Sequence, residues 1–327
     1  MDAVTAMLDG HSARGAFLLR CVLDAPWSIL LRDRSAVSLT VVAAGTAWLI
    51  RGDDAVGLGT GDVLLVKGIE PFVLADAPST APMVAIEPGQ ECRSLTGGSP
   101  GEDVPLTRFM GTRTWGNAAP GSPGDTVLLT GVYERDSQVT GQLLAAMPTA
   151  VVLRADEWHS PLLDLLRVEM TREAPGQDAV LDRLVDLLLV SALREWFARA
   201  EADAPLWWRA RHDPVIGRAL DLMHSHPERP WSVDRLAREV AVSRATFARR
   251  FGELVGTPPM AYLTGWRLAL AADLLRGTDR TLASVAAEVG YTNPFALSVA
   301  FKRRFGTSPQ GYRRSAPVVA AGAGAPS

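Results

Sequence analysis

The feature that most constrains the fold of this chain is a segment that occurs twice near its C-terminus. The first copy, Leu236–Pro259, reads LAREVAVSRATFARRFGELVGTPP, and the second, Val285–Pro309, reads VAAEVGYTNPFALSVAFKRRFGTSP. Several residues return at matching places: Phe251, Gly256 and Pro259 as Phe301, Gly306 and Pro309, and Glu239 as Glu288. The C-terminal part of the chain is therefore expected to hold two copies of one small structural unit.

Each copy has the pattern of a short amphipathic helix, a tight turn and a second helix with basic residues on its outer side. This is the layout of a helix-turn-helix, whose second helix enters the major groove of DNA. The apolar positions that would form the two small cores are Leu236, Val240, Phe247 and Phe251 in the first copy and Val285, Val289, Phe301 and Phe305 in the second. Between the copies, Met260–Gly277 is long and amphipathic, so we expect a rigid helix that fixes their separation.

The outward residues of each second helix are the candidates for contacting DNA. In the first copy they are Ser243, Arg244, Thr246, Ala248, Arg249 and Arg250. Arginine can donate two hydrogen bonds to a guanine edge, and a good pair discriminates between bases by about 1–3 kcal/mol. Ser243 stands at the start of the helix, where its hydroxyl and the free backbone N–H groups suit a phosphate.

The second copy presents a different outer side. Its candidates are Thr292, Asn293, Ala296, Ser298 and Val299, followed by Lys302 and Arg303. Apolar side chains can touch a thymine methyl group, and Asn293 or Ser298 can hydrogen-bond to a base, but strong guanine readout is absent. We therefore expect the first copy to carry most of the base specificity and the second to anchor the protein through phosphates.

The charge of the chain is divided unevenly. The 327 residues carry a net charge of −3, yet residues 209–315 hold 17 basic and 9 acidic side chains, whereas the rest hold 16 and 27. A basic C-terminal domain on an acidic body favours a polyanion-binding module joined to a domain of another kind. The chain has only two cysteines, no signal-peptide pattern and no apolar run of membrane-spanning length. We therefore expect a cytoplasmic protein that does not contact a membrane.

The N-terminal half has the pattern of a β-structure. Short β-branched segments such as AVSLTVVAAGTAWLIRG are separated by glycine turns, which predicts a sandwich or barrel. The spacing of apolar residues becomes helical from Trp158. We predict an α+β multidomain fold: a cupin-like β-barrel over residues 1–157, a helical dimerisation or linker region over 158–208, an all-α tandem helix-turn-helix domain over 209–315 and a disordered tail over 316–327.

A wide apolar face is predicted on a helix of the linker region. It is formed by Leu181, Leu184, Val185, Leu188 and Leu189, with Val180 and Leu187 at its borders. Two interpretations remain open. The face either packs on the core of its own protomer or forms the seam of a homodimer.

The C-terminal segments resemble the double helix-turn-helix domain of AraC/XylS-type regulators. The resemblance covers residues 213–314 and includes HPERPWSVDRLAREVAVSRATFARRF, PMAYLTGWRLALAADLL and VAAEVGYTNPFALSVAFKRRFGTSPQGYRR. It implies two recognition helices, held by a linker helix, that enter major-groove segments one helical turn, about 34 Å, apart. Residues 8–205 are similar, more loosely, to the cupin-type sensor domain of one branch of these regulators. That similarity implies a ligand-binding barrel followed by helices that dimerise the protein.

The residues that would line the barrel are less well defined. The candidates for binding an effector are Trp27, Leu39, Val41, Ala43, Trp48 and Leu64, and a filled apolar core explains each of them equally well. A one-residue slip of a strand would reverse which of them points inward. The resembling branch often carries histidines in two barrel motifs, and Thr40 and Pro71 stand at these positions here. Neither a metal site nor another cofactor is therefore expected.

These patterns predict a sequence-specific DNA-binding transcriptional regulator that responds to a small molecule in its barrel. The expected partners are double-stranded DNA, the effector, a second copy of the chain and RNA polymerase. The alternatives are a ligand-independent regulator controlled by a protein partner and an architectural DNA-binding protein. No enzyme is expected, because the chain has no G-x-S-x-G element, Gly-rich phosphate loop or Cys-x-x-Cys pair. The effector, the operator and the choice between activation and repression remain open.

Overall fold

Two compact units make up the protein. The computed structural model describes residues 16–68, 70–96, 108–111, 113–119, 121–133, 138–172, 174–199 and 204–314. Among these, residues 16–133 and 143–199 belong to one unit, and residues 138–142 and 204–314 belong to the other. The first unit is rich in strands and the second is helical, which confirms the α+β multidomain prediction.

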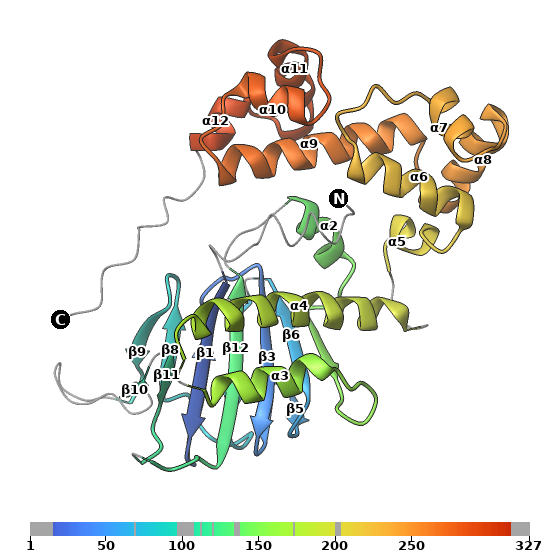
Figure 1. Ribbon diagram of the computed structural model, residues 1–327. Helices are drawn as coiled ribbons and strands as arrows, with labels where there is room; N and C mark the ends of the chain where they lie inside the picture. Colours follow the sequence, from blue (N-terminus) through green and yellow to red (C-terminus); the bar gives the residue numbers. More distant parts are fainter. Residues whose placement is uncertain are drawn as a thin grey trace. The chain divides into compact units, whose positions relative to one another are not determined.

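The β-rich unit is built from two sheets (Figure 1). In its described residues, the seven-stranded sheet has the order β10 (Arg108–Gly111), β11 (Thr114–Gly116), β1 (Ala16–Leu23), β12 (Thr126–Tyr133), β3 (Val37–Ala44), β6 (Val63–Lys67) and β13 (Ala150–Leu153). The six-stranded sheet has the order β5 (Asp54–Leu58), β4 (Ala47–Arg51), β7 (Phe72–Ala75), β2 (Ser28–Leu31), β8 (Val84–Glu87) and β9 (Glu91–Ser94). Neighbouring strands are antiparallel except for two parallel pairs, β1 with β11 and β2 with β8.

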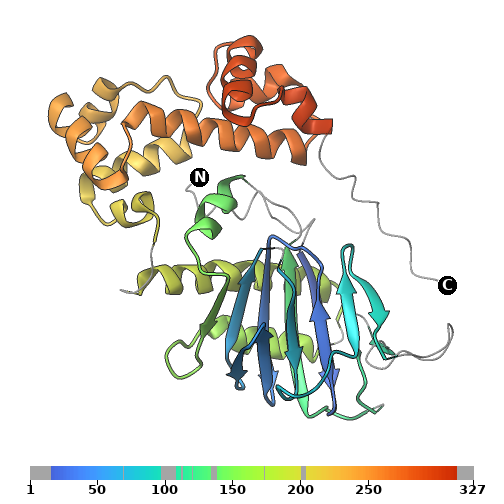
Figure 2. The same cartoon turned by 180° about the vertical axis from the view of Figure 1, so that it is seen from behind.

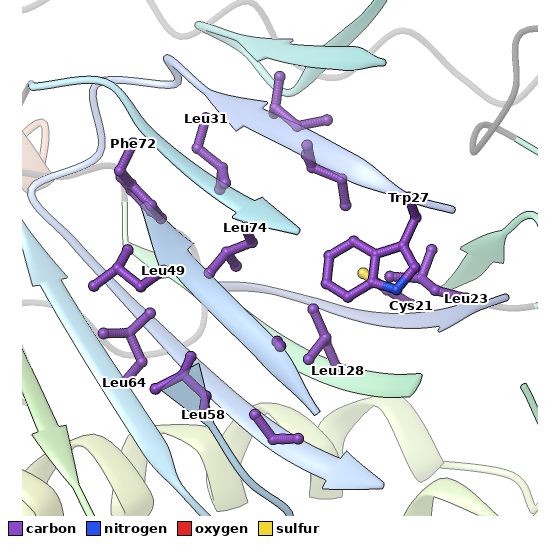
Figure 3. Packing of buried hydrophobic residues seen from close by; sticks show 14 of the residues in the cluster. Cys21, Leu23, Trp27, Leu31, Leu49, Leu58, Leu64, Phe72, Leu74 and Leu128 are labelled. Atoms are coloured by element: carbon purple, nitrogen blue, oxygen red, sulfur yellow. The ribbon is translucent and has the colours of Figure 1, made fainter. Parts of the chain in front are cut away.

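The core of this unit lies between the two sheets (Figure 3). The seven-stranded sheet contributes Cys21, Leu23, Val42, Leu64 and Leu128, and the facing sheet contributes Ile29, Leu31, Leu49, Phe72 and Leu74. Trp27 directly precedes β2 and is fully buried among them. Because successive side chains of a strand point to opposite faces, these residues also fix which neighbours point away from the core.

Two helices cover the outer face of the seven-stranded sheet. They are α3 (Pro161–Met170) and α4 (Gln177–Ala198), and α4 runs across β1, β12, β3 and β6 in Figure 1. A side chain on Gly131 of β12 would come within 2.5 Å of the Val185 side chain, so α4 rests directly on the sheet. The absence of a side chain at Gly131 thus allows this close approach.

The dimer seam predicted on α4 is wrong for four of its five residues. Leu181, Val185, Leu188 and Leu189 are buried inside the protomer, where they cover the sheet, and only Leu184 stays half-buried. The alternative interpretation, core packing, is the correct one for this face. The apolar residues that remain exposed lie elsewhere on the two helices: Leu165 and Val168 on α3, and Val180 and Leu187 on α4.

The helical unit contains the repeated segments. Its described helices are α5 (Leu206–Ala210), α6 (Pro214–Ser225), α7 (Val233–Glu239), α8 (Arg244–Val255), α9 (Pro259–Gly277), α10 (Leu282–Glu288), α11 (Pro294–Phe305) and α12 (Pro309–Arg314). A further helix, α2 (Gln138–Ala145), spans the chain position where the two units are divided. The predicted spacer is α9, which extends from the group α6–α8 to the group α10–α12 in both views (Figures 1 and 2).

The limits of the recognition helices follow from their capping residues. Ser243 and Asn293 cap the starts of α8 and α11 through their side-chain oxygens. Gly256 and Gly306 end the same helices with φ of 78° and 74°, a left-handed conformation that favours glycine. The repetition of both glycines in the sequence is thus explained by two equivalent helix ends.

Candidate DNA interface

Both recognition helices have one buried and one exposed side. The buried side of α8 is formed by Phe247, Phe251 and Val255, and that of α11 by Leu297 and Phe301. Most of the predicted core residues are buried as expected, while Val240 and Phe305 are half-buried. The remaining side of each helix is therefore free to contact another molecule.

The two exposed sides can be compared position by position, because Phe251 and Phe301 are equivalent in the repeat. Ala245, Arg249 and Glu253 on α8 correspond to Phe295, Val299 and Arg303 on α11, and all six are exposed. Residues four apart are neighbours on a helix surface, so each set forms one continuous stripe. The stripe of the first motif carries charge at its centre and end, whereas the stripe of the second motif is apolar at Phe295 and Val299 and carries charge only at Arg303.

Two predicted arginines of α8 make surface ion pairs. Arg244 lies 3.5 Å from Asp234, and Arg249 donates to both carboxylate oxygens of Glu253 at 2.8 and 2.9 Å. Ion pairs between exposed side chains contribute only about 0–1 kcal/mol, so phosphates or guanines can replace these partners at low cost. Both arginines are exposed, Arg249 on the outer stripe of α8 and Arg244 at the first position of the helix.

Arg250 has a different position from the one predicted. Its side chain is half-buried, and its Nε donates to Oδ2 of Asp213 at 3.0 Å, with Nη2 donating to the same oxygen. Partial burial raises the pKa of Asp213, but hydrogen bonds from Ile216 N, Arg250 and Val215 N outweigh it and hold this pKa below its usual value. Arg250 is thus engaged in joining α8 to the start of α6, and its assignment as a base-reading residue is corrected.

The two helix caps use the side chains that were also candidates for contacting DNA. Asn293 Oδ1 accepts from Ala296 N at 2.8 Å, and its Nδ2 donates to Thr292 Oγ1 at 3.4 Å. Ser243 Oγ accepts from Thr246 N at 3.1 Å and lies 2.8 Å from Thr246 Oγ1. The prediction that Asn293 reads a base is therefore wrong for its side-chain oxygen, because this oxygen already accepts a hydrogen bond from the backbone of α11.

The other candidates lie along the exposed sides or at their borders. Lys302 and Arg303 are exposed in the last turns of α11, and Ala248 and Ser298 are half-buried at equivalent positions of the two helices. Phe295 was missed by the sequence reasoning. It is 78% exposed at the start of α11, and the repeat itself could have revealed it, since Phe295 stands where the first copy has the outward Ala245.

The effector candidates are divided between three surfaces of the β-rich unit. Leu39 pairs with Gly131, which faces α4, so Leu39 and Val41 point toward the helices and not into the sandwich. Trp48 lies on the outer face of the second sheet, because its neighbour Leu49 points inward, and its ring covers Gly57. These three assignments to an internal pocket are wrong, whereas Trp27 and Leu64 do belong to the interior.

Polar groups are also present within the sandwich. Thr40 pairs with Leu64 across β3 and β6 and therefore points inward, where its Oγ1 lies 3.3 Å from Oγ1 of Thr130. The indole nitrogens of Trp27 and Trp115 have no hydrogen-bond partner among the described residues. A buried donor without a partner costs about 1–3 kcal/mol, which makes these two groups candidates for binding a ligand. The described residues contain no cluster of three or more His, Cys, Asp or Glu side chains that could hold a metal ion.

Comparison with known proteins identifies both units. Residues 2–198 match a cupin family model, and residues 236–315 match a helix-turn-helix domain model. The chain is 32% identical over 320 residues to a protein of Streptomyces lividans named as an AraC-like transcription regulator, covering 96% of this chain and 98% of that protein. The chain belongs to the AraC-like family of transcriptional regulators.

A second regulator is similar over nearly the whole length of the chain, and a solved structure is similar over about a third of it. The HTH-type transcriptional regulator AlkR of Acinetobacter baylyi is 27% identical over 323 residues, which cover 96% of this chain and 99% of that protein. Among solved structures, the DNA-binding domain of AdpA in complex with a target DNA is 34% identical, with a TM-score of 0.30, and covers 32% of this chain and 92% of that chain. Within the described part of the protein, no helix is long and apolar enough to span a membrane. The chain is thus a DNA-binding transcriptional regulator of AraC-like type.

Proposed function

We propose that this regulator binds an operator through both recognition helices and changes its DNA binding or its activation of transcription when a small molecule enters the β-sandwich. It acts in the cytoplasm, has RNA polymerase as a partner and catalyses no reaction of its own. The observation that carries the effector part of the proposal is the pair of unsatisfied indole donors beside the apolar core.

The proposed effector site is centred on Trp27. Its indole packs beside Cys21 and Leu23 (Figure 3), and Trp115 pairs with Cys21 on the same face of the sheet. The surroundings are apolar, and the indole N–H groups of Trp27 and Trp115 have no acceptor among the described residues. We infer an effector that is mainly apolar and carries one or two acceptors, such as carbonyl or carboxylate oxygens, because such a molecule satisfies both donors while it buries apolar surface.

The DNA side of the proposal assigns different tasks to the two motifs. Arg249 lies at the centre of the exposed stripe of α8 and reads guanine, and Arg244, exposed at the first position of the helix, contacts the DNA backbone. Lys302 and Arg303 of α11 neutralise phosphates. If six to ten phosphates are contacted in all, affinity falls by about 10³–10⁵-fold between 50 and 200 mM salt.

Dimerisation is assigned to the exposed side of α3 and α4. The four large apolar residues there, Leu165, Val168, Val180 and Leu187, are 45–54% exposed, and the two helices pack against each other. Exposed apolar residues gathered on neighbouring helices favour a protein interface. A second copy of the chain is the proposed occupant, so that two protomers present four recognition helices to one operator.

The effector proposal is tested by tryptophan fluorescence and DNA binding in the full chain. A library of apolar compounds with carbonyl or carboxylate groups is screened, and a binder is expected to change the emission of the wild type and to alter operator affinity by about 5–150-fold. Trp27→Phe and Trp115→Phe should weaken that binder, and Trp48→Phe, on the outer face of the sandwich, is the matched control. A binder that leaves DNA affinity and transcription unchanged would refute the coupling and favour control by a protein partner.

A further inference from the structure

Phe295 is the most exposed large apolar side chain among the described residues. It is 78% exposed at the second position of α11, the recognition helix of the second motif. A single exposed apolar side chain is ordinary on a protein surface, so the neighbours of Phe295 decide whether it belongs to a contact site. Its position is therefore the starting point for a function beyond phosphate contact.

The core of the second motif does not depend on Phe295. Leu297 and Phe301 fill it from α11, and the ring of Phe301 lies 4.5 Å from that of Phe305 and 5.2 Å from that of Tyr312. These aromatic contacts lie on the buried side of the helix. Removal of the Phe295 ring thus leaves the packing of the motif intact.

Val299 extends the apolar surface by one helical turn. It is 55% exposed and lies four residues after Phe295, so the two side chains are neighbours on the helix surface. Thr292 borders this patch before the helix, and the exposed cations Lys302 and Arg303 follow it. An apolar patch with cations at one end matches the surface of a major groove, where the thymine C5-methyl group lies between phosphate-lined edges.

The first motif has no such patch. Ala245 and Arg249 occupy the equivalent places on α8, so the two helices present a cation and an apolar surface respectively to the same part of a groove. Arginine suits guanine, and apolar side chains suit the thymine methyl group. The two motifs are therefore suited to different bases, the first to guanine and the second to thymine.

We propose that Phe295 and Val299 read thymine methyl groups in the half-site contacted by α11. This inference rests on the proposed function, since it requires that α11 enters a major groove of the operator. It makes the second motif a reader of sequence as well as an anchor. The preferred operator then combines a guanine-containing element under α8 with a thymine-containing element under α11, about ten base pairs away.

The test uses the full chain and an operator selected from a random DNA library. Each thymine of the half-site assigned to α11 is replaced in turn by deoxyuridine, which lacks only the methyl group. The wild type is expected to lose about fourfold in affinity for each contacted methyl group, because the burial of one carbon, about 0.8 kcal/mol, no longer contributes to binding. Phe295→Ala and Val299→Ala should each lose the preference for the methyl group that the replaced side chain contacts, the double variant should bind the thymine and uracil sites with equal affinity, and Phe295→Leu should retain part of the preference.

The control variant is Leu95→Ala, which removes an exposed apolar side chain from the β-rich unit, outside the proposed interfaces, and should keep the full methyl preference. Equal thermal melting of all variants shows that they are folded. If the wild type binds its selected site but does not distinguish thymine from uracil, the inference is overturned while the proposed function stands. Loss of activation by Phe295→Ala with unchanged DNA binding would likewise overturn it and assign the patch to a protein partner. Absence of any selected site would overturn both.

Discussion

Arg250 on α8 and Asp213 at the start of α6 form an ion pair within the first helix-turn-helix region. Asp213 uses its other oxygen to accept from Val215 N and Ile216 N at 3.0 and 2.9 Å, so one carboxylate both caps α6 and holds α8. The recognition helix that carries Arg249 is thereby fixed by a residue 37 positions earlier in the chain. Two adjacent arginines of α8 therefore have different roles: Arg250 stabilises the helical unit, and Arg249 is the one available to contact DNA.

Replacement of Asp213 is predicted to destabilise the helical unit. Asp213→Ala removes a helix cap, which typically costs about 0.5–2 kcal/mol, and also leaves Arg250 without its partner. Asp234→Ala is the matched control, because its pair with Arg244 is exposed and contributes about 0–1 kcal/mol. Thermal or urea unfolding of the full chain measures both, and equal losses would contradict the account.

The contribution of Asp213 is predicted to depend on pH. Its folded-state pKa is lowered, so its stabilisation is complete above the usual carboxyl pKa of about 4 and is lost as the pH falls through the lower, folded-state value. The difference in free energy of unfolding between wild type and Asp213→Asn should therefore be constant between about pH 5 and pH 7 and shrink below about pH 4. A difference that grows on acidification would refute this role.

Gly131 is predicted to be required for the close packing of α4 on the seven-stranded sheet. A Cβ at this position would lie 2.5 Å from Val185 Cγ1, so Gly131→Ala should cost about 1–3 kcal/mol through overpacking. The double variant Gly131→Ala, Val185→Ala creates space for the new methyl group and should be more stable than the sum of the two single changes implies. Additive losses in urea unfolding would show that the two residues do not share this contact.

The two sides of α4 are predicted to respond differently to substitution. Leu188 is fully buried, and Leu188→Ala should lower the free energy of unfolding by about 2–5 kcal/mol. Leu187 is 47% exposed, and Leu187→Ser should weaken dimers at little cost to the protomer. Sedimentation over a range of concentrations separates these effects, and an unchanged dimer in Leu187→Ser would exclude the proposed interface.

The arginine and lysine of the two motifs are predicted to affect DNA binding in different ways. Arg249→Ala should relax the preference at one guanine by about 1–3 kcal/mol, whereas Lys302→Ala should weaken binding to all sequences alike and reduce the salt slope by about one unit. Binding to specific and random duplexes at several salt concentrations measures both quantities. An equal loss of specificity in the two variants would refute the division of tasks.

The repeat allowed the helical unit to be predicted almost completely. The spacer helix, the cap at Ser243 and the separation of core from outward residues follow from local sequence patterns, and the structure contains each of them. Arg250 could not be predicted in the same way, because its partner lies 37 residues away and the helical period alone places it near the outward side. Asn293 was ambiguous for another reason, since one side chain can cap a helix or contact a base.

The β-rich unit was predicted in class but not in detail. The face to which each strand side chain points depends on the strand register, which the sequence does not fix. Leu39 and Val41 were expected in the interior, but they lie on the opposite face of β3, under α4. The spacing of apolar residues correctly predicted that α4 is a helix. The same spacing could not show whether the apolar face of α4 packs on the sheet of its own protomer or on a second protomer. The glycine at position 131 allows α4 to pack closely on β12, but this role can be recognised only from the structure, where Gly131 lies against Val185.

Selection of bound sequences from a random DNA library, with the full chain at fixed salt, tests the central claim most directly. Two half-elements about ten base pairs apart are predicted, with guanine in the one whose preference is lost in Arg249→Ala and thymine in the one whose preference is lost in Phe295→Ala. Binding without any enriched sequence would contradict the account, because both recognition helices would then contact phosphates alone.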